Sequence, residues 1–227
     1  MFDASAAPGR IEAMSTPASP AFALLVPVKP ASRAKSRLAS LGDDLRRSLV
    51  AAFAVDTVGA ALRTSCVGAV LVVTDDHELA AALRGVGAEV IPDGVADDLN
   101  ESLVQAGAEA HRRWPELGLA ALCADLPALD PVELARALEE ASRHPTAFVA
   151  DAAGEGTTLV AALSPADFTP RFGPGSREAH LADGAHEVVD VDVPTLRRDV
   201  DTPADLREAI ELGVGPRTAS VAIGLRL

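Results

Sequence analysis

The stretch AFALLVPV, residues 21–28, decides the fold class of this chain. It is a short, unbroken apolar run, and the cation-rich sequence KPASRAKSR follows it directly. A strand with one face in water alternates apolar and polar residues, whereas a strand buried on both faces of a parallel sheet is apolar throughout. The stretch therefore predicts a buried strand of a parallel sheet, with a polar loop at its carboxyl end.

The chain up to about residue 150 alternates between such runs and segments with helical periodicity. Further strands are predicted over residues 67–76, 88–93, 118–127 and 146–151, and helices over residues 43–62, 77–87, 97–114 and 130–144. Pro131 stands in the first turn of the last helix, where no intrahelical N–H is needed. Alternation of this kind builds a parallel sheet with helices on both faces and right-handed crossovers.

The pattern changes after residue 150. Apolar runs over residues 157–164 and 186–194 are separated by loops of Gly, Pro and Asp, which predicts a small antiparallel addition before a last helix over 203–213. We therefore expect an α/β fold with a Rossmann-like, mixed but mostly parallel sheet. The expected organisation is a disordered leader over residues 1–20, a single domain over 21–213 and a loosely ordered tail over 214–227.

Composition and charge exclude several classes of protein. The net charge of −13 repels nucleic acid and anionic membranes, and 3% aromatic residues with no Tyr provide few rings on which bases could stack. No apolar run approaches the length of a membrane span. Cys66 and Cys123 form no CxxC pair, which favours reduced thiols in a cytoplasmic protein. We expect neither nucleic acid nor a membrane as a partner, and we allow for a homodimer.

Common catalytic motifs are missing from the sequence. There is no GxxxxGK[ST], no GxGxxG at the start of the first helix, no GxSxG and no HExxH. These absences argue against a P-loop enzyme, a dinucleotide-binding Rossmann site, an α/β-hydrolase and a zinc protease of the HExxH type.

Four cations follow the first predicted strand within nine residues, namely Lys29, Arg33, Lys35 and Arg37. In doubly wound sheets, ligands bind beyond the carboxyl ends of the strands. Lysine as a point charge and arginine as a planar fork both suit phosphate oxygens. A solvated basic turn is the alternative, but the position at a strand end favours a triphosphate site.

Two acids stand at the ends of predicted elements. Asp125 follows the fourth strand in LCADLPAL, and Asp201 precedes the last helix in DVDTPADL. Carboxylates at such positions can hold Mg²⁺, which prefers few protein carboxylates together with phosphate oxygens. Taken singly, Asp125 is equally consistent with a turn, and Asp201 or Thr202 with a helix cap. If the two acids meet in space, they form a metal site.

Two glycine-containing loops lie in the second half of the chain. DAAGEGTTL (151–159) contains Thr157 and Thr158, and FGPGSREAH (172–180) contains Ser176. Flexible backbone N–H groups and hydroxyls can face an anion, although each loop alone is a weak signal because such turns are common. Together the loops indicate a second anion site, distinct from the basic loop.

These motifs, in this order and at these separations, resemble the phospholactate guanylyltransferase family, whose bacterial branch uses phosphoenolpyruvate. The motifs are PVK with AKSRL, LCADLPAL, DAAGEGTTL, FGPGS and DVDTPADL. The resemblance runs from about residue 22 to 212, and the pair GTTL and FGPGS is its most specific part. It implies a nucleotide-diphospho-sugar transferase-like fold and a cytoplasmic enzyme that makes a guanylylated precursor of the deazaflavin coenzyme F-420 from GTP.

The resemblance also implies roles for individual residues. Asp125 and Asp201 would bind Mg²⁺, Lys29, Lys35 and Arg37 would meet the GTP phosphates, and Thr158, Gly173 and Ser176 would bind phosphoenolpyruvate. Asn100 would lie near the guanosine; from its position alone, a role at the start of the helix is the alternative. The acceptor could also be 2-phospho-L-lactate or 3-phosphoglycerate. Two further alternatives are another nucleotidyltransferase and a non-catalytic nucleotide-binding regulator.

Overall fold

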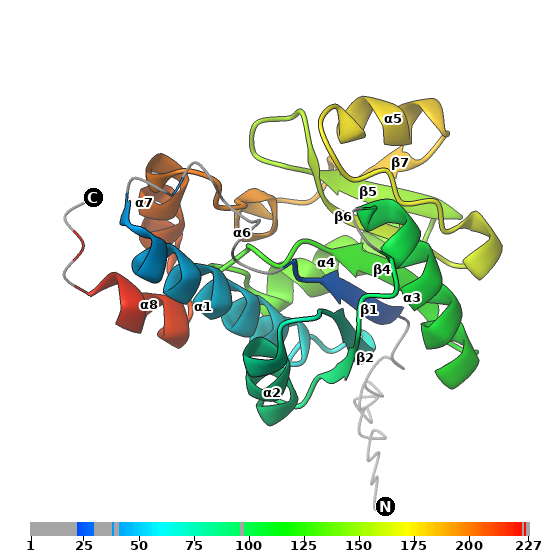
Figure 1. The fold of residues 1–227 in the computed structure, drawn as a ribbon. Coiled ribbons are helices and arrows are strands. Elements are labelled where there is room, and N and C mark those ends of the chain that lie inside the picture. Colours follow the sequence, from blue (N-terminus) through cyan, green and yellow to red (C-terminus); the bar gives the residue numbers. More distant parts are fainter. Residues whose placement is uncertain (1–21, 30–37, 39–40, 96–97, 224, 226–227) are drawn as a thin grey trace, which may run out of the picture.

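The computed structural model describes residues 22–29, 38, 41–95, 98–223 and 225 (Figure 1). The strands are β1 (Phe22–Pro27), β2 (Val67–Val73), β3 (Glu89–Ile91), β4 (Gly118–Leu122), β5 (Thr146–Ala150), β6 (Thr157–Ala162) and β7 (His186–Glu187). The helices are α1 (Asp43–Ala61), α2 (His77–Gly85), α3 (Leu99–Arg113), α4 (Pro131–Ala141), the 3₁₀ helix η2 (Pro165–Asp167), α5 (Ser176–Ala182), α6 (Pro194–Arg197), α7 (Pro203–Leu212) and α8 (Pro216–Ala222). Within these residues, no helix combines the length and apolar character that crossing a bilayer requires. The expected leader lies outside the described residues.

All seven strands form one sheet in the order β3-β2-β1-β4-β6-β5-β7. Strands β3, β2, β1 and β4 run parallel to one another. β6 is antiparallel to both β4 and β5, and β7 is parallel to β5. β6 is therefore the single reversed strand of a mostly parallel sheet, which confirms the predicted fold class. The antiparallel addition is smaller than expected: of the predicted run 186–194, only His186 and Glu187 pair as a strand, and they run parallel to β5.

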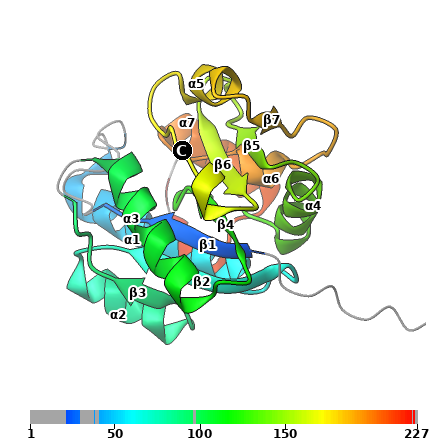
Figure 2. The same ribbon diagram turned by 90° about the vertical axis from the view of Figure 1, so that its right-hand side faces the viewer.

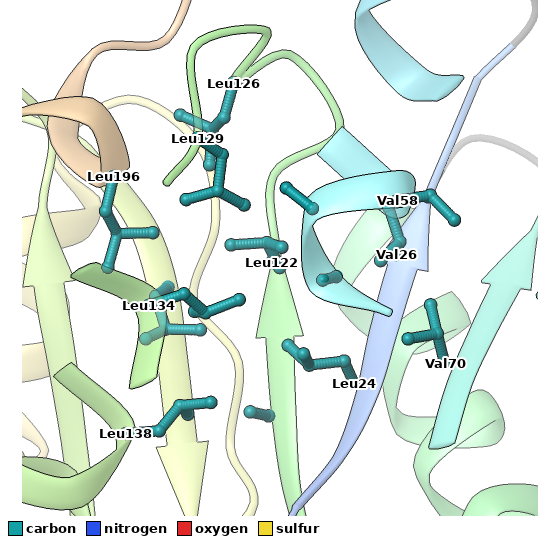
Figure 3. Packing of buried hydrophobic residues seen from close by; sticks show 14 of the residues in the cluster. Leu24, Val26, Val58, Val70, Leu122, Leu126, Leu129, Leu134, Leu138 and Leu196 are labelled. Atoms are coloured by element: carbon teal, nitrogen blue, oxygen red, sulfur yellow. The ribbon is translucent and has the colours of Figure 1, made fainter. Parts of the chain in front are cut away.

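The central strand β1 is buried on both faces, as its sequence predicts. Residues Phe22 to Val26 are at most 1% exposed. Leu24 and Val26 pack with α1 and α4, and Figure 3 shows them in one layer with Leu122 of β4. Ala23 and Leu25 belong to the cluster on the other face, and Figure 2 shows α3 lying across β1 and β4 there. Burial of apolar side chains on both faces stabilises this part of the sheet.

The reversal of β6 brings two distant segments together. In the β4–β6 pairing, Leu122 lies opposite Leu159, and the Cys123 N–H donates to the Thr158 carbonyl at 2.9 Å. The start of β6 therefore lies beside the carboxyl end of β4. As a result, the loop over residues 151–156 reaches the same edge of the sheet as the loop that carries Asp125.

Part of the segment expected to be a loosely held tail is a helix. α8 packs beside α1, and Figure 1 shows the two side by side. The Asp56 carboxylate of α1 accepts hydrogen bonds from the Arg217 N–H at 3.1 Å and the Thr218 N–H at 2.7 Å. Asp56 thus satisfies two N–H groups at the start of α8 that have no partner within the helix. A Cβ atom on Gly215 would lie 2.4 Å from the Asp56 carboxyl carbon, so this close approach requires glycine.

Candidate active site

Three carboxylates meet at the carboxyl edge of the sheet. Asp125 follows β4, and Asp199 and Asp201 precede α7; one ligand oxygen from each lies within 4.8 Å of the others. We call these three residues the acidic cluster. The structure therefore brings together the two acids singled out in the sequence and adds Asp199. The Asp-Val-Asp spacing was the available signal for Asp199, because side chains two residues apart in an extended segment face the same side.

The backbone holds the two parts of the acidic cluster in register. The Val200 N–H donates to the Asp125 carbonyl oxygen at 3.1 Å. The Val200 side chain is fully buried in a cluster with Phe53 and Leu206. Since Val200 stands between Asp199 and Asp201, its hydrogen bond and its burial fix both acids relative to Asp125.

A buried threonine on α1 holds the loop that carries Asp125. The Thr57 hydroxyl donates to the Ala124 carbonyl at 3.2 Å and accepts from the Leu126 N–H at 3.1 Å. Its two partners are the residues immediately before and after Asp125, and Thr57 itself is fully buried. Nothing in the sequence near Asp125 indicates this contact, because Thr57 is separated from it by the second and third strands.

A capping box supports Asp201. The Thr202 hydroxyl accepts from the Asp205 N–H at 3.2 Å, and the Asp205 carboxylate accepts from the Thr202 N–H at 2.7 Å. Of the two predicted caps, Asp201 and Thr202, the structure shows Thr202 as the cap of α7. The same carboxylate accepts from the Asp201 N–H at 3.1 Å. The motif Thr-Pro-Ala-Asp therefore both starts α7 and holds the backbone of an acid of the cluster.

A hollow of about 170 Å³ opens between the ends of β1 and β4, lined in part by Lys29, Asp125 and Phe172. The Lys29 Nζ donates to Asp93, which follows β3, at 2.5 Å. Burial raises the pKa of Asp93, but hydrogen bonds from Lys29 and Ser102 outweigh it and leave the pKa below its ordinary value. Asp93 is therefore an ionised partner of Lys29. The other predicted phosphate-binding residues, Lys35 and Arg37, lie outside the described residues.

Asn100 joins α3 to the FGPGS loop. Its side-chain N–H donates to the Phe172 carbonyl at 3.0 Å, and its carbonyl oxygen accepts from the Phe172 N–H at 2.8 Å. Both polar ends of the amide thus bind the same backbone residue. The cap of α3 is Asp98, whose carboxylate accepts from the N–H groups of Asn100 and Glu101. Asn100 therefore positions the start of the loop that contains Gly173 and Ser176.

The two glycine-containing loops contact each other. The Arg177 N–H donates to the Glu155 carbonyl at 3.2 Å, which joins FGPGSREAH to DAAGEGTTL. Gly173 and Gly175 have φ angles of 131° and 70°, values that residues with a Cβ atom rarely adopt. The structure therefore brings together the two segments from which the sequence analysis inferred a second anion site.

Three buried side chains link these loops to each other and to α5. The Thr157 and Ser176 hydroxyl oxygens are 3.1 Å apart, and Thr157 Oγ1 lies 3.1 Å from His180 Nδ1. We call Thr157, Ser176 and His180 the Thr157 network. The Thr158 hydroxyl lies instead 3.5 Å from the Val149 carbonyl, to which it donates. Sequence reasoning noted Thr157 but did not select it, and it missed His180, since no local pattern relates the three residues.

Comparison with known proteins identifies the family. A family model described as Guanylyl transferase CofC like matches residues 22–225. The chain belongs to this family. A relative from Thermomonospora curvata, named phosphoenolpyruvate guanylyltransferase, is 51% identical over 201 residues, which cover 88% of each chain.

Solved structures show that the fold of this CofC-like guanylyl transferase is shared more widely. A nucleotidyl transferase from Methanothermobacter thermautotroptrophicus matches with a TM-score of 0.58 and 24% identity, over 85% of this chain and 97% of the other. A protein from Mycobacterium tuberculosis, solved in complex with manganese, matches with a TM-score of 0.52 and 20% identity, over 85% and 99%. At these identities the likeness concerns the fold, which is that of nucleotide-diphospho-sugar transferases.

The donor set of the acidic cluster fits a divalent cation. Three carboxylates within 4.8 Å repel one another, and hard oxygen ligands of this kind suit Mg²⁺ or Mn²⁺. A second group, Glu140, His144 and His186, meets the same distance criterion. The rings of His144 and His186 stack with centroids 3.6 Å apart and planes 9° apart. Ring-nitrogen lone pairs lie in the ring plane, so those of two stacked rings do not converge on one ion.

Two arginines of the second half have partners that the sequence did not indicate. Arg177 forms a bidentate ion pair with Glu187 at 2.9 and 2.8 Å, so its charge is neutralised by its neighbour. The Arg197 guanidinium donates to the carbonyls of Ala150 at 3.0 Å and Val188 at 2.6 Å. Carbonyl groups carry no net charge, so these bonds leave the positive charge of Arg197 at the carboxyl ends of β5 and β7.

The two cysteines have no part in the clusters described above. Neither forms a disulfide within the described residues. Burial raises the pKa of the Cys66 thiol to about 11, which disfavours the nucleophilic thiolate. The Cys123 thiol donates to the Thr157 carbonyl oxygen at 3.4 Å.

Proposed function

We propose that this chain transfers GMP from GTP to phosphoenolpyruvate, giving enolpyruvoyl-2-diphospho-5'-guanosine and pyrophosphate, in the synthesis of the deazaflavin coenzyme F-420. The observation that carries the proposal is the position of the acidic cluster beside the two joined glycine-containing loops, at one edge of the sheet. Membership of the CofC-like family supports the guanylyl donor. The name of the 51% identical relative, phosphoenolpyruvate guanylyltransferase, supports phosphoenolpyruvate as the acceptor.

Asp125 and Asp201, with Asp199 beside them, are proposed to hold Mg²⁺. The bound ion would supply positive charge that lowers the repulsion between two multiply charged substrates and stabilises the leaving pyrophosphate. The protein contributes a rigid set of ligands. The Val200 hydrogen bond, the Thr57 contacts and the capping box fix the backbone around the acids before any substrate arrives.

The basic residues after β1 are proposed to meet the triphosphate. Lys29 lines the hollow together with Asp125, and its bond to Asp93 fixes the direction of its long side chain. Lys35 and Arg37 are proposed as further phosphate ligands on the grounds of the sequence resemblance. Asn100 is proposed to lie near the guanosine, where its amide also holds the Phe172 backbone.

Thr158, Gly173 and Ser176 are proposed to bind the acceptor. Support comes from the contact between the loops that contain them and from the proximity of Thr158 to the strand end before Asp125. The backbone at Gly173 and Gly175 adopts positive φ angles, and nothing lies within 4 Å of the place that a Cβ atom would take at either residue. Holding the acceptor in this place serves chiefly to orient it toward GTP.

The chemical step requires no covalent enzyme intermediate. An oxygen of the acceptor phosphate attacks the α-phosphorus of GTP in line, a new P–O bond forms, and the bond to the β-phosphate oxygen breaks. Pyrophosphate leaves with the electron pair of that bond. The attacking oxygen is already anionic, so no general base is needed, and the residues act by positioning and by charge.

To test the proposal, the purified protein is incubated with GTP, Mg²⁺ and one acceptor at a time, and the release of pyrophosphate is measured. We expect phosphoenolpyruvate to give the highest kcat/KM, above 2-phospho-L-lactate and 3-phosphoglycerate, and GTP to be preferred over ATP and CTP. Mass spectrometry of the product would confirm the guanylylated acceptor. Binding of GTP without release of pyrophosphate in the presence of any of the acceptors would identify a nucleotide-binding regulator and overturn the proposal.

A further inference from the structure

The tautomer of His180 is fixed by a backbone group. The Arg171 N–H donates to His180 Nε2 at 3.1 Å. A backbone N–H can only donate, so Nε2 must present its lone pair, and the proton of the neutral imidazole must sit on Nδ1. Nδ1 is the nitrogen that lies 3.1 Å from Thr157 Oγ1. His180 therefore donates to the Thr157 hydroxyl oxygen.

The surroundings of His180 favour this neutral form. The side chain is 1% exposed and stacks on Phe148 with ring centroids 5.2 Å apart. Burial lowers the pKa of His180 below its ordinary value, although the Ser176 carbonyl and Asp183 act to raise it; Arg171 acts to lower it. Protonation would also place a hydrogen on Nε2 against the Arg171 N–H, so the charged form loses a hydrogen bond.

The tautomer of His180 determines which group donates in each hydrogen bond of the Thr157 network when an anion is bound. Either hydroxyl of Thr157 and Ser176 can supply the proton between their oxygens, which are 3.1 Å apart. When an anion binds Ser176, the Ser176 hydroxyl must donate to it, because phosphate and carboxylate oxygens only accept. Thr157 must then donate to Ser176, and its oxygen receives the Nδ1–H of His180. Hydrogen bonds that run in one direction polarise and strengthen one another.

We propose that His180 and Thr157 are positioning residues that present the Ser176 hydroxyl as a hydrogen-bond donor to the anionic acceptor. Neither residue needs to touch the acceptor. The proposal rests on the proposed function in one respect, namely that Ser176 contacts the acceptor. It adds that the site is selective for groups that accept hydrogen bonds, since the buried imidazole orders the hydroxyls in one direction.

Two variants of His180 separate this role from simple packing. The Asn amide nitrogen is as many bonds from Cα as Nδ1, so His180→Asn can keep the donor to Thr157 while losing the acceptor for Arg171. The Gln amide oxygen is as many bonds from Cα as Nε2, so His180→Gln can keep the Arg171 contact while losing the donor. We expect His180→Gln to raise the KM for phosphoenolpyruvate about 10-fold, and His180→Asn to raise it less than about 3-fold.

Thr157 provides a second pair, which keeps the proposal testable if a buried His180 variant fails to fold. Thr157→Val keeps the shape and removes the hydroxyl, and should raise the KM for phosphoenolpyruvate about 10-fold. Thr157→Ser keeps the hydroxyl and should stay within about 2-fold of the natural protein. The KM for GTP is the internal control and should be unchanged in all four variants. An unchanged KM for phosphoenolpyruvate in Thr157→Val, or equal effects of Val and Ser, would overturn the proposal.

The deciding measurement is the double variant Ser176→Ala/His180→Gln. If His180 acts through Ser176, the double variant has nearly the KM of Ser176→Ala alone. If the two effects multiply, His180 acts independently and the proposal fails. Failure of the proposed function gives a different result: the natural protein releases no pyrophosphate, or Ser176→Ala itself leaves the KM for phosphoenolpyruvate unchanged.

Discussion

The acidic cluster and the Thr157 network lie at the same edge of the sheet but are held in different ways. The acids are fixed through their backbone, by the Val200 hydrogen bond and the Thr57 contacts, while their carboxylates converge. In the Thr157 network the side chains hold one another, through a chain from His180 to Ser176. The first arrangement gathers like charges, and the second sets the direction of hydroxyl groups.

This difference relates to what each region would bind. Three carboxylates at this separation repel one another, and a bound cation would lower that repulsion, so the backbone contacts help to hold them together. Neutral hydroxyls need no such scaffold, but they can point either way unless a group of fixed polarity orders them. The neutral His180 supplies that polarity. The two regions are therefore expected to respond differently to mutation, to metal ions and to pH.

The largest effect is expected from a change in the acidic cluster, which should slow the chemical step more than it weakens binding of the acceptor. Asp125→Asn should lower kcat by about 1,000-fold, because the loss of a metal ligand removes several kcal/mol of charge stabilisation. The KM for phosphoenolpyruvate should change much less. The matched control is Asp190→Asn, a change at an exposed acid after β7, which should leave pyrophosphate release unaffected. If Asp125→Asn released pyrophosphate at more than a tenth of the natural rate, the acidic cluster would not be part of the reaction.

The next effect tests whether the acids repel one another. Without divalent cation, Asp199→Asn should raise the free energy of unfolding by about 1 kcal/mol, because one of three crowded charges is gone. Added Mg²⁺ should stabilise the natural protein more than this variant, which reverses their order. Urea unfolding with EDTA and with Mg²⁺ measures both states. Equal stabilisation of the two proteins by Mg²⁺ would contradict a metal site that includes Asp199.

The same contrast explains what the sequence could and could not predict. The apolar run of β1 and the alternation of strands and helices predict the sheet, because burial on both faces leaves a local pattern. The positions of the two acids were also predictable, since Asp125 stands where a strand ends and Asp201 stands just before a helix begins. The contacts of Thr57 were not, because they join segments 67 and 69 residues apart. α8 was missed for a similar reason: its start is capped by Asp56, 161 residues earlier.

An effect on both stability and kcat is expected when the support of Asp125 is removed and the acid itself is kept. Thr57→Val should cost about 1–3 kcal/mol of stability, since the Ala124 carbonyl and the Leu126 N–H lose their buried partner. It should also lower kcat while leaving the KM for phosphoenolpyruvate unchanged. Thr57→Ser keeps the hydroxyl and should recover most of both. An equal loss of stability in the Ser and Val variants would show that the methyl group matters and the hydrogen bonds do not.

The smallest effect distinguishes the Thr157 network by its dependence on pH. The pKa of His180 is lowered in the folded protein, chiefly by burial, so the unfolded chain binds the proton more readily. Its contribution to stability is therefore complete above about pH 6.5 and is lost as the pH falls through the folded pKa. One proton gives a slope of at most about 1.4 kcal/mol per pH unit. The measurement is the free energy of unfolding of the natural protein and of His180→Asn from about pH 8 to 5. The two curves should diverge as the pH falls, because only the natural protein loses the contribution of His180. Parallel curves would mean that His180 carries the same charge in the folded and unfolded states.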